Sequence, residues 1–433
     1  MTDRLSQRHR KWLGWFRVLA GFGSVQMVIQ VLGFLSGILI VRHLSKPDYA
    51  WFTIANGLVA TLGMIADSGI SGGLSSLGGT IWQDNTRFGS LIQTALTLRR
   101  KFTVVTVILV TPVFIWLLFR NQAPPATVAV VVAAALAGFS LQLTAGILGI
   151  VLSLRQEIRR MQTLGLGTAL VRLALLTSAC LVFIDVRVAV IIGVSGPGLQ
   201  AFFLRRRVKE SVDWDAPETP DYRKRLLDVV KRQAPLTIFY CFQGQIVVWL
   251  ISIFGSKDRV AEIGALGRFA MIFSVVASVL NGVVIPRFAR CQDRTILRRR
   301  YWQVVAGFAL LAASLVVLSA IFPRPLLWVL GGRYANLEDE VWIMRLSAAL
   351  GALFATQHAL TYSKAWIAPA LVSIPMELVT LVILILSLDI STVRGVLWLS
   401  CISFIPPIFL NMIIVRHELR RRPESSQSAS GSE

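Results

Sequence analysis

The sequence has few charged residues, and few of these are acids. Only 15% of its 433 residues are charged and 55% are apolar, and it has 23 Asp and Glu against 44 Lys and Arg. So few polar side chains could not cover the surface of a soluble domain of this size. The composition therefore excludes an ordinary soluble fold and predicts a chain that is solvated largely by lipid.

Cysteine and histidine are also scarce, at four each. The cysteines are far apart and have no metal-ligand spacing, so we expect neither structural disulfides nor a bound metal. They are Cys180, Cys241, Cys291 and Cys401. The sequence also lacks the phosphate-binding GxxxxGK[ST] motif, the GxSxG nucleophile elbow and the HExxH zinc motif. We therefore expect that the protein is not an enzyme and uses no cofactor.

Long apolar stretches fill most of the chain. At about 20 residues per crossing, twelve membrane spans fit the sequence. We place them at 20–42, 48–70, 102–120, 126–152, 165–184, 188–204, 235–254, 261–285, 301–322, 337–360, 366–388 and 395–415. The expected fold class is an all-α integral membrane protein with about twelve transmembrane helices.

The basic residues alternate in density between successive gaps. With the amino terminus in the cytoplasm, 32 of the 44 Lys and Arg fall in cytoplasmic segments, 9 in external loops and three within spans. Because basic loops stay on the cytoplasmic side, this pattern predicts a multi-pass protein with both termini in the cytoplasm. The net charge of +21 then serves membrane orientation and contact with lipid headgroups, and we expect no nucleic-acid binding.

Two halves of similar length are separated by the longest polar gap, 205–233, which is typical of a cytoplasmic linker. Similar stretches follow corresponding spans: Ser45-Lys46-Pro47-Asp48 and Ser256-Lys257-Asp258, then Phe183-Ile184-Asp185 and Ser387-Leu388-Asp389. They favour an internal repeat, with two six-helix lobes around a central cavity. We expect a basic cytoplasmic lead at 1–17, an N-terminal lobe at 18–204, the linker at 205–233, a C-terminal lobe at 234–415 and a disordered cytoplasmic tail at 416–433.

Prolines interrupt corresponding spans of the two halves. Pro197 lies in the sixth span, Pro406 and Pro407 lie in the twelfth, and Pro375 lies in the eleventh. Paired interruptions of this kind occur near the central sites of transporters, so we expect hinges or helix breaks at these four prolines.

Four ionisable residues lie well inside the spans, where a charge costs at least ~2.5–3.5 kcal/mol and normally faces a cavity or a partner. They are Arg172, Arg268, Arg345 and Glu377. We expect the arginines to line the cavity and bind an anionic substrate, because guanidinium forms bidentate bonds to phosphate or carboxylate oxygens. A repeat offset of 205 predicts that Glu377 faces Arg172 across the cavity. The alternative is that each charge pairs locally or extends to the membrane surface.

Asp67 comes at the end of the second span, just before a glycine-rich run. One interpretation is a residue that stabilises a helix end, and the other is a gating or ion-coupling carboxylate. Glu377 is the second candidate for gating or for coupling to an H+ or Na+ gradient.

Four short stretches resemble the polysaccharide (oligosaccharide, Wzx-like) flippases of the multidrug/oligosaccharidyl-lipid/polysaccharide exporter superfamily. The segment 41–52 resembles their R-x-L-S-P-x-x-Y-G-x-F stretch, although Ala50 stands where the family usually has Gly. Asp67-Ser68-Gly69-Ile70 resembles the D-x-G that ends their second span. Ile285-Pro286-Arg287 and Gly331-Gly332-Arg333-Tyr334-Ala335 are similar to later landmarks of the family.

The resemblance implies a transporter of the bacterial inner (plasma) membrane. It would flip an undecaprenyl-pyrophosphate-linked oligosaccharide from the inner to the outer leaflet for polysaccharide export, by alternating access between two lobes. Its partners would be this lipid-linked substrate, membrane lipids, and the polysaccharide polymerase and glycosyltransferases. Two other interpretations stay open: a drug or peptidoglycan-precursor exporter of the same superfamily, and a membrane polymerase or ligase acting on lipid-linked glycans, which the short external loops disfavour.

Overall fold

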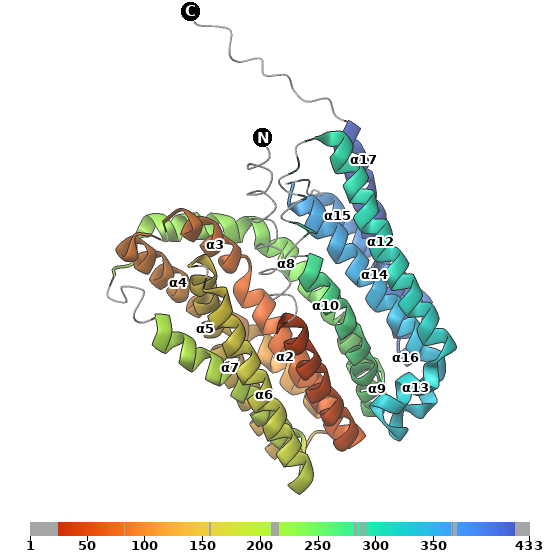
Figure 1. Cartoon of the computed structure of the whole chain (residues 1–433). Coiled ribbons are helices and arrows are strands. Elements are labelled where there is room, and N and C mark those ends of the chain that lie inside the picture. The colour runs from red at the N-terminus through yellow and green to blue at the C-terminus, as the bar shows by residue number, and fades with distance from the viewer. Residues whose placement is uncertain are drawn as a thin grey trace, which may run out of the picture.

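A computed structural model describes residues 25–420, apart from 82, 156, 209–215, 281–283, 286–287, 289–290, 292, 365 and 367–369. Every regular element in this part of the chain is a helix (Figure 1). The expected basic lead, 1–17, and the segment 421–433 of the expected tail lie outside the described residues.

The helices fall into two sets, one on each side of the segment 209–219. The first set is the helix Val25–His43, α2 (Lys46–Asp67), α3 (Ile70–Ile81), α4 (Asn85–Arg120), α5 (Pro125–Leu154), α6 (Ile158–Val182) and α7 (Val186–Val208). The second set is α8 (Pro220–Phe254), α9 (Lys257–Gly267), η1 (Arg268–Ala270), α10 (Met271–Val279), α12 (Arg294–Ile321), α13 (Pro323–Leu330), η3 (Gly332–Leu337), α14 (Glu338–Tyr362), α15 (Ala370–Ser387), α16 (Val393–Ser403) and α17 (Ile405–Arg420).

The helices account for the twelve expected membrane crossings. Within the described residues, ten helices are long and apolar enough to span a bilayer, counting α9 with α10 and α16 with α17 as one each. The other two crossings are α14, which has three acids in its first turn, and the shorter apolar helix α15. The protein is therefore an all-helical, multi-pass membrane protein.

Two helices extend beyond the expected spans into sequence that mixes charged and apolar residues. α4 begins at Asn85 rather than near 102, because the Asp84 carboxylate accepts the backbone N–H groups of Thr86 and Arg87. α8 begins at Pro220, so much of the expected linker is helical. The expected tail also starts later than 416, since α17 continues to Arg420.

The two sets of helices form two lobes that have equivalent connections. α2 begins directly after Ser45 and α9 directly after Ser256. Asp185, before α7, accepts the backbone N–H of Val188, and Asp389, before α16, accepts that of Ser391. Burial of Asp185 opposes ionisation, but its hydrogen bonds outweigh this effect and lower its pKa. The hydrogen bonds from Ser391 lower the pKa of Asp389. These matched loops agree with an internal repeat.

The lobes pack together at one end of the molecule, called here the closed end, which is formed by residues 44–49, 121–124, 255–263 and 330–341. Figure 1 shows the lobes side by side where α2 and α9 begin, and apart where α3 and α17 lie. A single buried cluster at the closed end takes residues from both lobes, for example Tyr49, Val260 and Tyr334.

Packing is different at the opposite end, called here the terminal end. One buried cluster there belongs to α3, α4, α5, α7 and the start of α8, and includes Leu91 and Leu226. Another belongs to the second lobe and includes Leu297, Leu360 and Val415. Among the described residues, no buried cluster joins α12 or α17 to the first lobe. The lobes are thus held together mainly at the closed end.

Polar bonds strengthen the contact at the closed end. Lys46 Nζ lies 3.0 Å from Glu262 Oε1, and the same oxygen accepts a bond from Asn336. Arg42 donates to the carbonyl oxygen of Val329 at 2.9 Å, and Arg333 donates to that of Leu44. Residues of the first lobe thereby bond to α9, to the end of α13 and to η3.

Breaking the Lys46–Glu262 pair is expected to open the closed end more often. Glu262→Gln removes an ion pair that is largely buried, and a loss of ~1.4 kcal/mol would raise the open population about tenfold. The measurement is maleimide labelling of Leu44→Cys, a buried position at this end, in a chain whose native cysteines have been replaced.

Asp185→Asn is the matched control, because its partner, Arg187, is in the same lobe. Labelling that is equally fast in both variants would mean that the Lys46–Glu262 pair does not hold the lobes together.

Candidate functional site

Arg268 bridges the two lobes inside the membrane. It begins η1, the short 3-10 turn between α9 and α10, and its Nε donates to the Tyr49 hydroxyl of α2 at 3.0 Å. Its guanidinium lies 5.9 Å from the centre of the Tyr49 ring and 5.8 Å from that of Phe52. Tyr49 is fully buried and donates to the Gly264 carbonyl oxygen at 3.1 Å. α2 therefore fixes the position of the Arg268 side chain.

The first helix makes room for the same arginine. A Cβ atom added at Gly37 would lie 3.1 Å from Arg268 Nη1 and 3.2 Å from its Cδ. Gly37 therefore lets the helix Val25–His43 approach the guanidinium closely. Arg268 is held between two helices of the opposite lobe, and its side chain reaches the first-lobe interior.

Arg172 lies on α6 and lines a cavity of about 440 Å³ between the helix Val25–His43, α6 and α7. The cavity wall is rich in polar side chains that carry no charge, including Gln26, Gln30, Gln162 and Gln200. Arg172 Nε is buried and has no hydrogen-bond partner among the described residues. Such a buried donor has capacity for a ligand oxygen.

The helix Val25–His43 brings Arg172 and Arg268 to one region, because Gly37 lies against the Arg268 guanidinium and the neighbouring Ser36 lines the same cavity as Arg172. Among the residues that the structure describes, neither has an acidic side chain within 4.0 Å, the distance of an ion pair. Two guanidinium groups in a membrane interior, without a protein carboxylate between them, form a site that favours an anion. This pair is the candidate functional site.

Arg345 packs against η1, the turn that carries Arg268, and is not among the residues that line the Arg172 cavity. It lies on α14, is 7% exposed, and its guanidinium is 5.2 Å from the centre of the Phe269 ring. Its Nε also has no hydrogen-bond partner within the described ranges. Arg345 therefore contacts the residue next to Arg268, and its expected place in the cavity lining stays a prediction.

Glu377 makes no ion pair with Arg172 among the described residues, and its predicted place across the cavity from Arg172 stays a prediction. It lies on α15 at 2% exposure, and Tyr240 and Gln243 of α8 are close enough to interact with its carboxylate. Neither carboxylate oxygen has a hydrogen bond within the described part of the chain. Glu377 is thus buried within the second lobe, whereas Arg172 lies beside Arg268.

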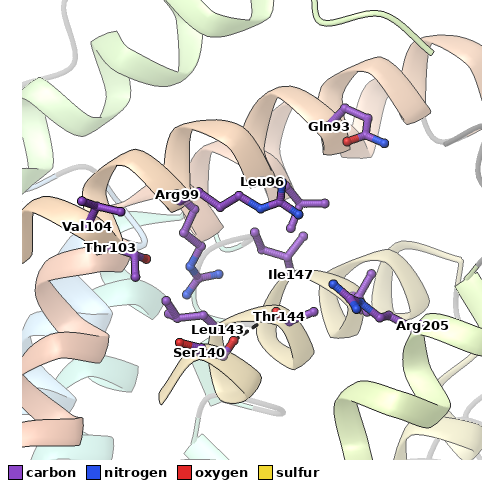
Figure 2. Close-up of a pocket in the computed structure, with 12 residues that line it drawn as sticks. Gln93, Leu96, Arg99, Thr103, Val104, Ser140, Leu143, Thr144, Ile147 and Arg205 are labelled. Carbon is purple, nitrogen blue, oxygen red and sulfur yellow. Dashed lines mark hydrogen bonds between the residues drawn. The ribbon is translucent and has the colours of Figure 1, made fainter. Parts of the chain in front are cut away.

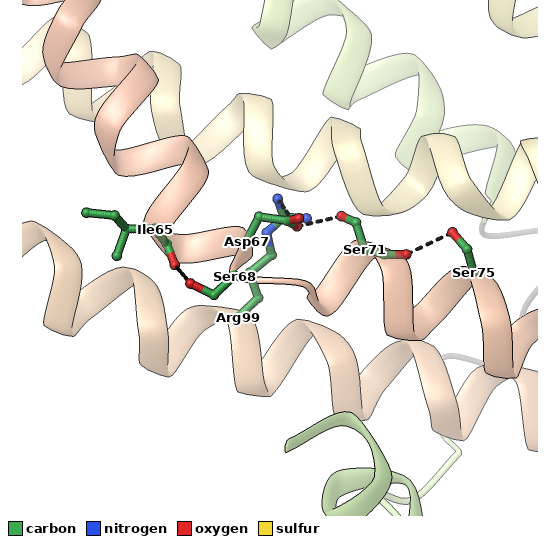
Figure 3. A network of polar contacts seen from close by, with 6 residues as sticks. All are labelled: Ile65, Asp67, Ser68, Ser71, Ser75 and Arg99. Carbon is green, nitrogen blue, oxygen red and sulfur yellow. Dashed lines mark hydrogen bonds and ion pairs between the residues drawn. The ribbon is translucent and has the colours of Figure 1, made fainter. Parts of the chain in front are cut away.

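Asp67 ends α2 and is paired with Arg99 of α4, as Figure 3 shows. Its Oδ1 lies 3.1 Å from Arg99 Nη2 and accepts the Ser71 hydroxyl of α3 at 2.5 Å. An acid is unfavourable at a helix C-terminus, and Arg99 compensates for it. The left-handed φ values of Ser68 (33°) and Gly69 (95°) make the turn into α3. Through its bonds to Arg99 and Ser71, Asp67 joins the end of α2 to α4 and to the first turn of α3, as the helix-end interpretation expects, and the gating interpretation stays a prediction.

Two of the four prolines do not break a helix, and the other expectation for them, a hinge, stays a prediction. α7 runs unbroken through Pro197, and α15 runs unbroken through Pro375. In an apolar medium the remaining backbone hydrogen bonds are strongly favoured, so the loss of one N–H donor does not end a helix. An interruption does occur beside Pro406 and Pro407, where α16 ends at Ser403 and α17 begins at Ile405.

The expected spans leave Arg99 in the cytoplasmic loop between 70 and 102, so the sequence does not predict its burial. The structure buries it to 7% exposure within α4. The available signal was Asp67, an acid at the end of an apolar helix that needs a nearby cation.

No family model and no curated protein matches the sequence. Solved structures share its fold. One is described as the inward-facing conformation of a multidrug resistance MATE family transporter of the MOP superfamily, with a TM-score of 0.71 and 14% identity, over 92% of this chain and 98% of that one. A second is the lipid II flippase MurJ in an inward closed conformation, with a TM-score of 0.68 and 12% identity, over 91% and 87% of the two chains. A third is MATE in complex with MaD3S, with a TM-score of 0.63 and 14% identity over 93% and 94%. The chain therefore shares the two-lobe, all-helical fold of these proteins.

Proposed function

We propose that the protein flips a lipid-linked oligosaccharide, of the undecaprenyl-pyrophosphate type, from the inner to the outer leaflet of the bacterial inner membrane. The observation that carries the proposal is a pair of intramembrane cations: Arg172 lines the cavity beside the helix Val25–His43, and Arg268 lies against Gly37 of the same helix. A pyrophosphate offers several charged oxygens to two guanidinium groups, which a cationic drug does not. A lipid II flippase among the proteins of the same fold supports a lipid-linked substrate.

Alternating access would act through the lobe contact at the closed end. With the lobes held there, the substrate headgroup enters from the terminal end and meets Arg172 and Arg268. Rocking the lobes would then separate Tyr49 from Arg268 and release the headgroup on the other side. The sugar can contact the neutral amides of the cavity wall.

Energy for the cycle would come from an ion gradient coupled through Glu377. A carboxylate at 2% exposure without a nearby basic partner among the described residues is costly as an anion, so it takes up a proton or a cation. Glu377 lies in the second lobe, whereas the Arg172 cavity lies in the first. Ion coupling would give this intramembrane acid a role separate from substrate binding. Asp67 is less suited to this task because Arg99 already neutralises it.

The test is complementation of a strain that lacks the gene. The deletion is expected to lose surface polysaccharide and to accumulate lipid-linked repeat units on the inner leaflet, and the wild-type gene is expected to restore export. Repeat units that reach the outer leaflet but stay unpolymerised would instead indicate a polymerase or ligase. A normal polysaccharide with increased drug sensitivity, or an arrest of peptidoglycan synthesis, would indicate one of the other exporters.

A further inference from the structure

A second, larger groove lies on the first lobe, away from the Arg172 cavity. It has a volume of about 720 Å³ and is lined by α4, α5 and the end of α7. Figure 2 shows Arg99 and Arg205 at this groove, with Ser140 and Thr144 of α5. Arg100 also lines it, and no acidic residue is among its lining residues. The groove thus carries three cations, of which Asp67 neutralises one.

Arg99 has hydrogen-bonding capacity left for a ligand. It is 93% buried and uses Nη2 for Asp67, while Nε and Nη1 have no hydrogen-bond partner among the described residues. The guanidinium lies against Gly146 of α5, where an added Cβ would be 3.7 Å from Nη1. Arg99 thus lines the groove with two guanidinium nitrogens that have no partner within the described part of the chain. Such a group is suited to bind an anionic oxygen.

The cations lie at the depth of lipid headgroups. Arg99 precedes the closed-end terminus of α4, Arg120, by 21 residues, and Arg205 follows the closed-end terminus of α7, Val186, by 19. At 1.5 Å per residue each distance is about 30 Å, the thickness of the hydrocarbon core. Both arginines therefore lie at the headgroup level of the leaflet on the terminal side.

An apolar strip on α4 continues from the groove toward the closed end. Val104 lines the groove and is 58% exposed, and the strip continues through Val105, Ile108 and Leu109. Exposed aliphatic residues at this helical spacing face lipid acyl chains. The cations and the apolar strip are arranged like the headgroup and the chains of one lipid.

We propose that this groove is a binding site for an anionic phospholipid of the terminal-side leaflet. Its phosphate contacts Arg99 and Arg205, and an acyl chain lies along Val104 and Ile108. The positive charge of the groove favours an anionic over a zwitterionic headgroup, because a choline or ethanolamine cation would be repelled by Arg100 and Arg205. The site does not depend on which substrate the protein transports.

The test measures lipid binding to the purified full-length chain by native mass spectrometry and thermal unfolding. Phosphatidylglycerol is expected to bind and to raise the unfolding temperature, and phosphatidylcholine with the same acyl chains and inorganic phosphate are expected to do neither. Arg205→Gln and Arg100→Gln are each expected to weaken phosphatidylglycerol binding about fivefold, since a basic residue near an anionic lipid surface contributes ~1 kcal/mol.

Arg206→Gln is the matched control. It removes the same charge from the same helix, but Arg206 is exposed and does not line the groove. Arg99→Gln alone would leave Asp67 unpaired, so Asp67→Asn is combined with it, and this double variant is expected to show the largest loss of binding. The proposal is overturned if Arg206→Gln weakens binding as much as Arg205→Gln, if phosphatidylcholine binds equally well, or if inorganic phosphate displaces the lipid.

Discussion

Replacing Arg268 with alanine is expected to reduce the rate of lipid flipping about 10- to 100-fold while the protein still reaches the membrane. The loss of charge-assisted hydrogen bonds to a phosphate oxygen costs about 1.5–3 kcal/mol, which corresponds to this range. Arg172→Ala should have a similar effect. The measurement is the transfer of a fluorescent polyprenyl-pyrophosphate oligosaccharide across proteoliposomes that contain equal amounts of each variant.

Conservative substitutions distinguish the effect of the Arg268 charge from the effect of the position of its side chain. Arg268→Lys keeps the charge but loses the planar fork and its packing on Tyr49 and Phe52, so it should recover only part of the rate. Tyr49→Phe leaves both arginine charges in place and removes the hydroxyl that bonds to Arg268 Nε and to the Gly264 carbonyl oxygen, so a smaller loss is expected. Arg206→Ala removes an exposed charge and should leave the rate unchanged.

A double-variant cycle tests whether the two arginines act on one ligand. If both bind the same pyrophosphate, Arg172→Ala with Arg268→Ala should be little worse than either single change. Independent, multiplicative losses, or full activity in Arg268→Ala, would contradict a shared anion site.

The membrane spans could be predicted from the sequence because apolar length is a local property of the chain. The extensions of α4 and α8 could not, since residues 85–101 and 220–234 mix charged with apolar side chains. Their helical state depends on capping and on packing of apolar residues such as Leu91 and Leu226 against neighbouring helices. Pro197 misled the prediction for a related reason. In lipid, the other backbone hydrogen bonds of a helix are strongly favoured, so a helix can continue through a proline. Proline is therefore weaker evidence of a helix break in a membrane than in water.

The candidate site could be predicted only in part. Arg172 and Arg268 were identifiable because a charge within an apolar stretch is costly and rare. Their proximity was not, because the rotation of a helix about its axis is set by its neighbours: Gly37 and Tyr49 position Arg268, and neither carries a signal for that contact. The repeat offset likewise predicts the depth of Glu377 in the membrane but not the direction of its side chain.

Glu377→Gln is expected to uncouple transport from the ion gradient without blocking the movement of substrate. In proteoliposomes, an imposed proton gradient should accelerate flipping by the wild-type protein, and the variant should flip at one rate with or without the gradient. A Na+ gradient is tested in parallel, because a buried carboxylate can bind either ion. The groups that face Glu377 from α8 are Tyr240 and Gln243, and His358 of α14 contacts the Tyr240 ring with centroids 5.7 Å apart.

Stability decides whether Glu377 acts as an ion carrier or as a structural residue. Glutamine has nearly the same shape and no charge, so replacing an unpaired buried carboxylate should leave the unfolding temperature unchanged or raise it. Glu340→Gln, at the first turn of α14 outside the membrane interior, is the control and should keep its response to the gradient. If Glu377→Gln still responds to a gradient, or unfolds at a much lower temperature, the carboxylate is a structural partner within the second lobe and the coupling group lies elsewhere.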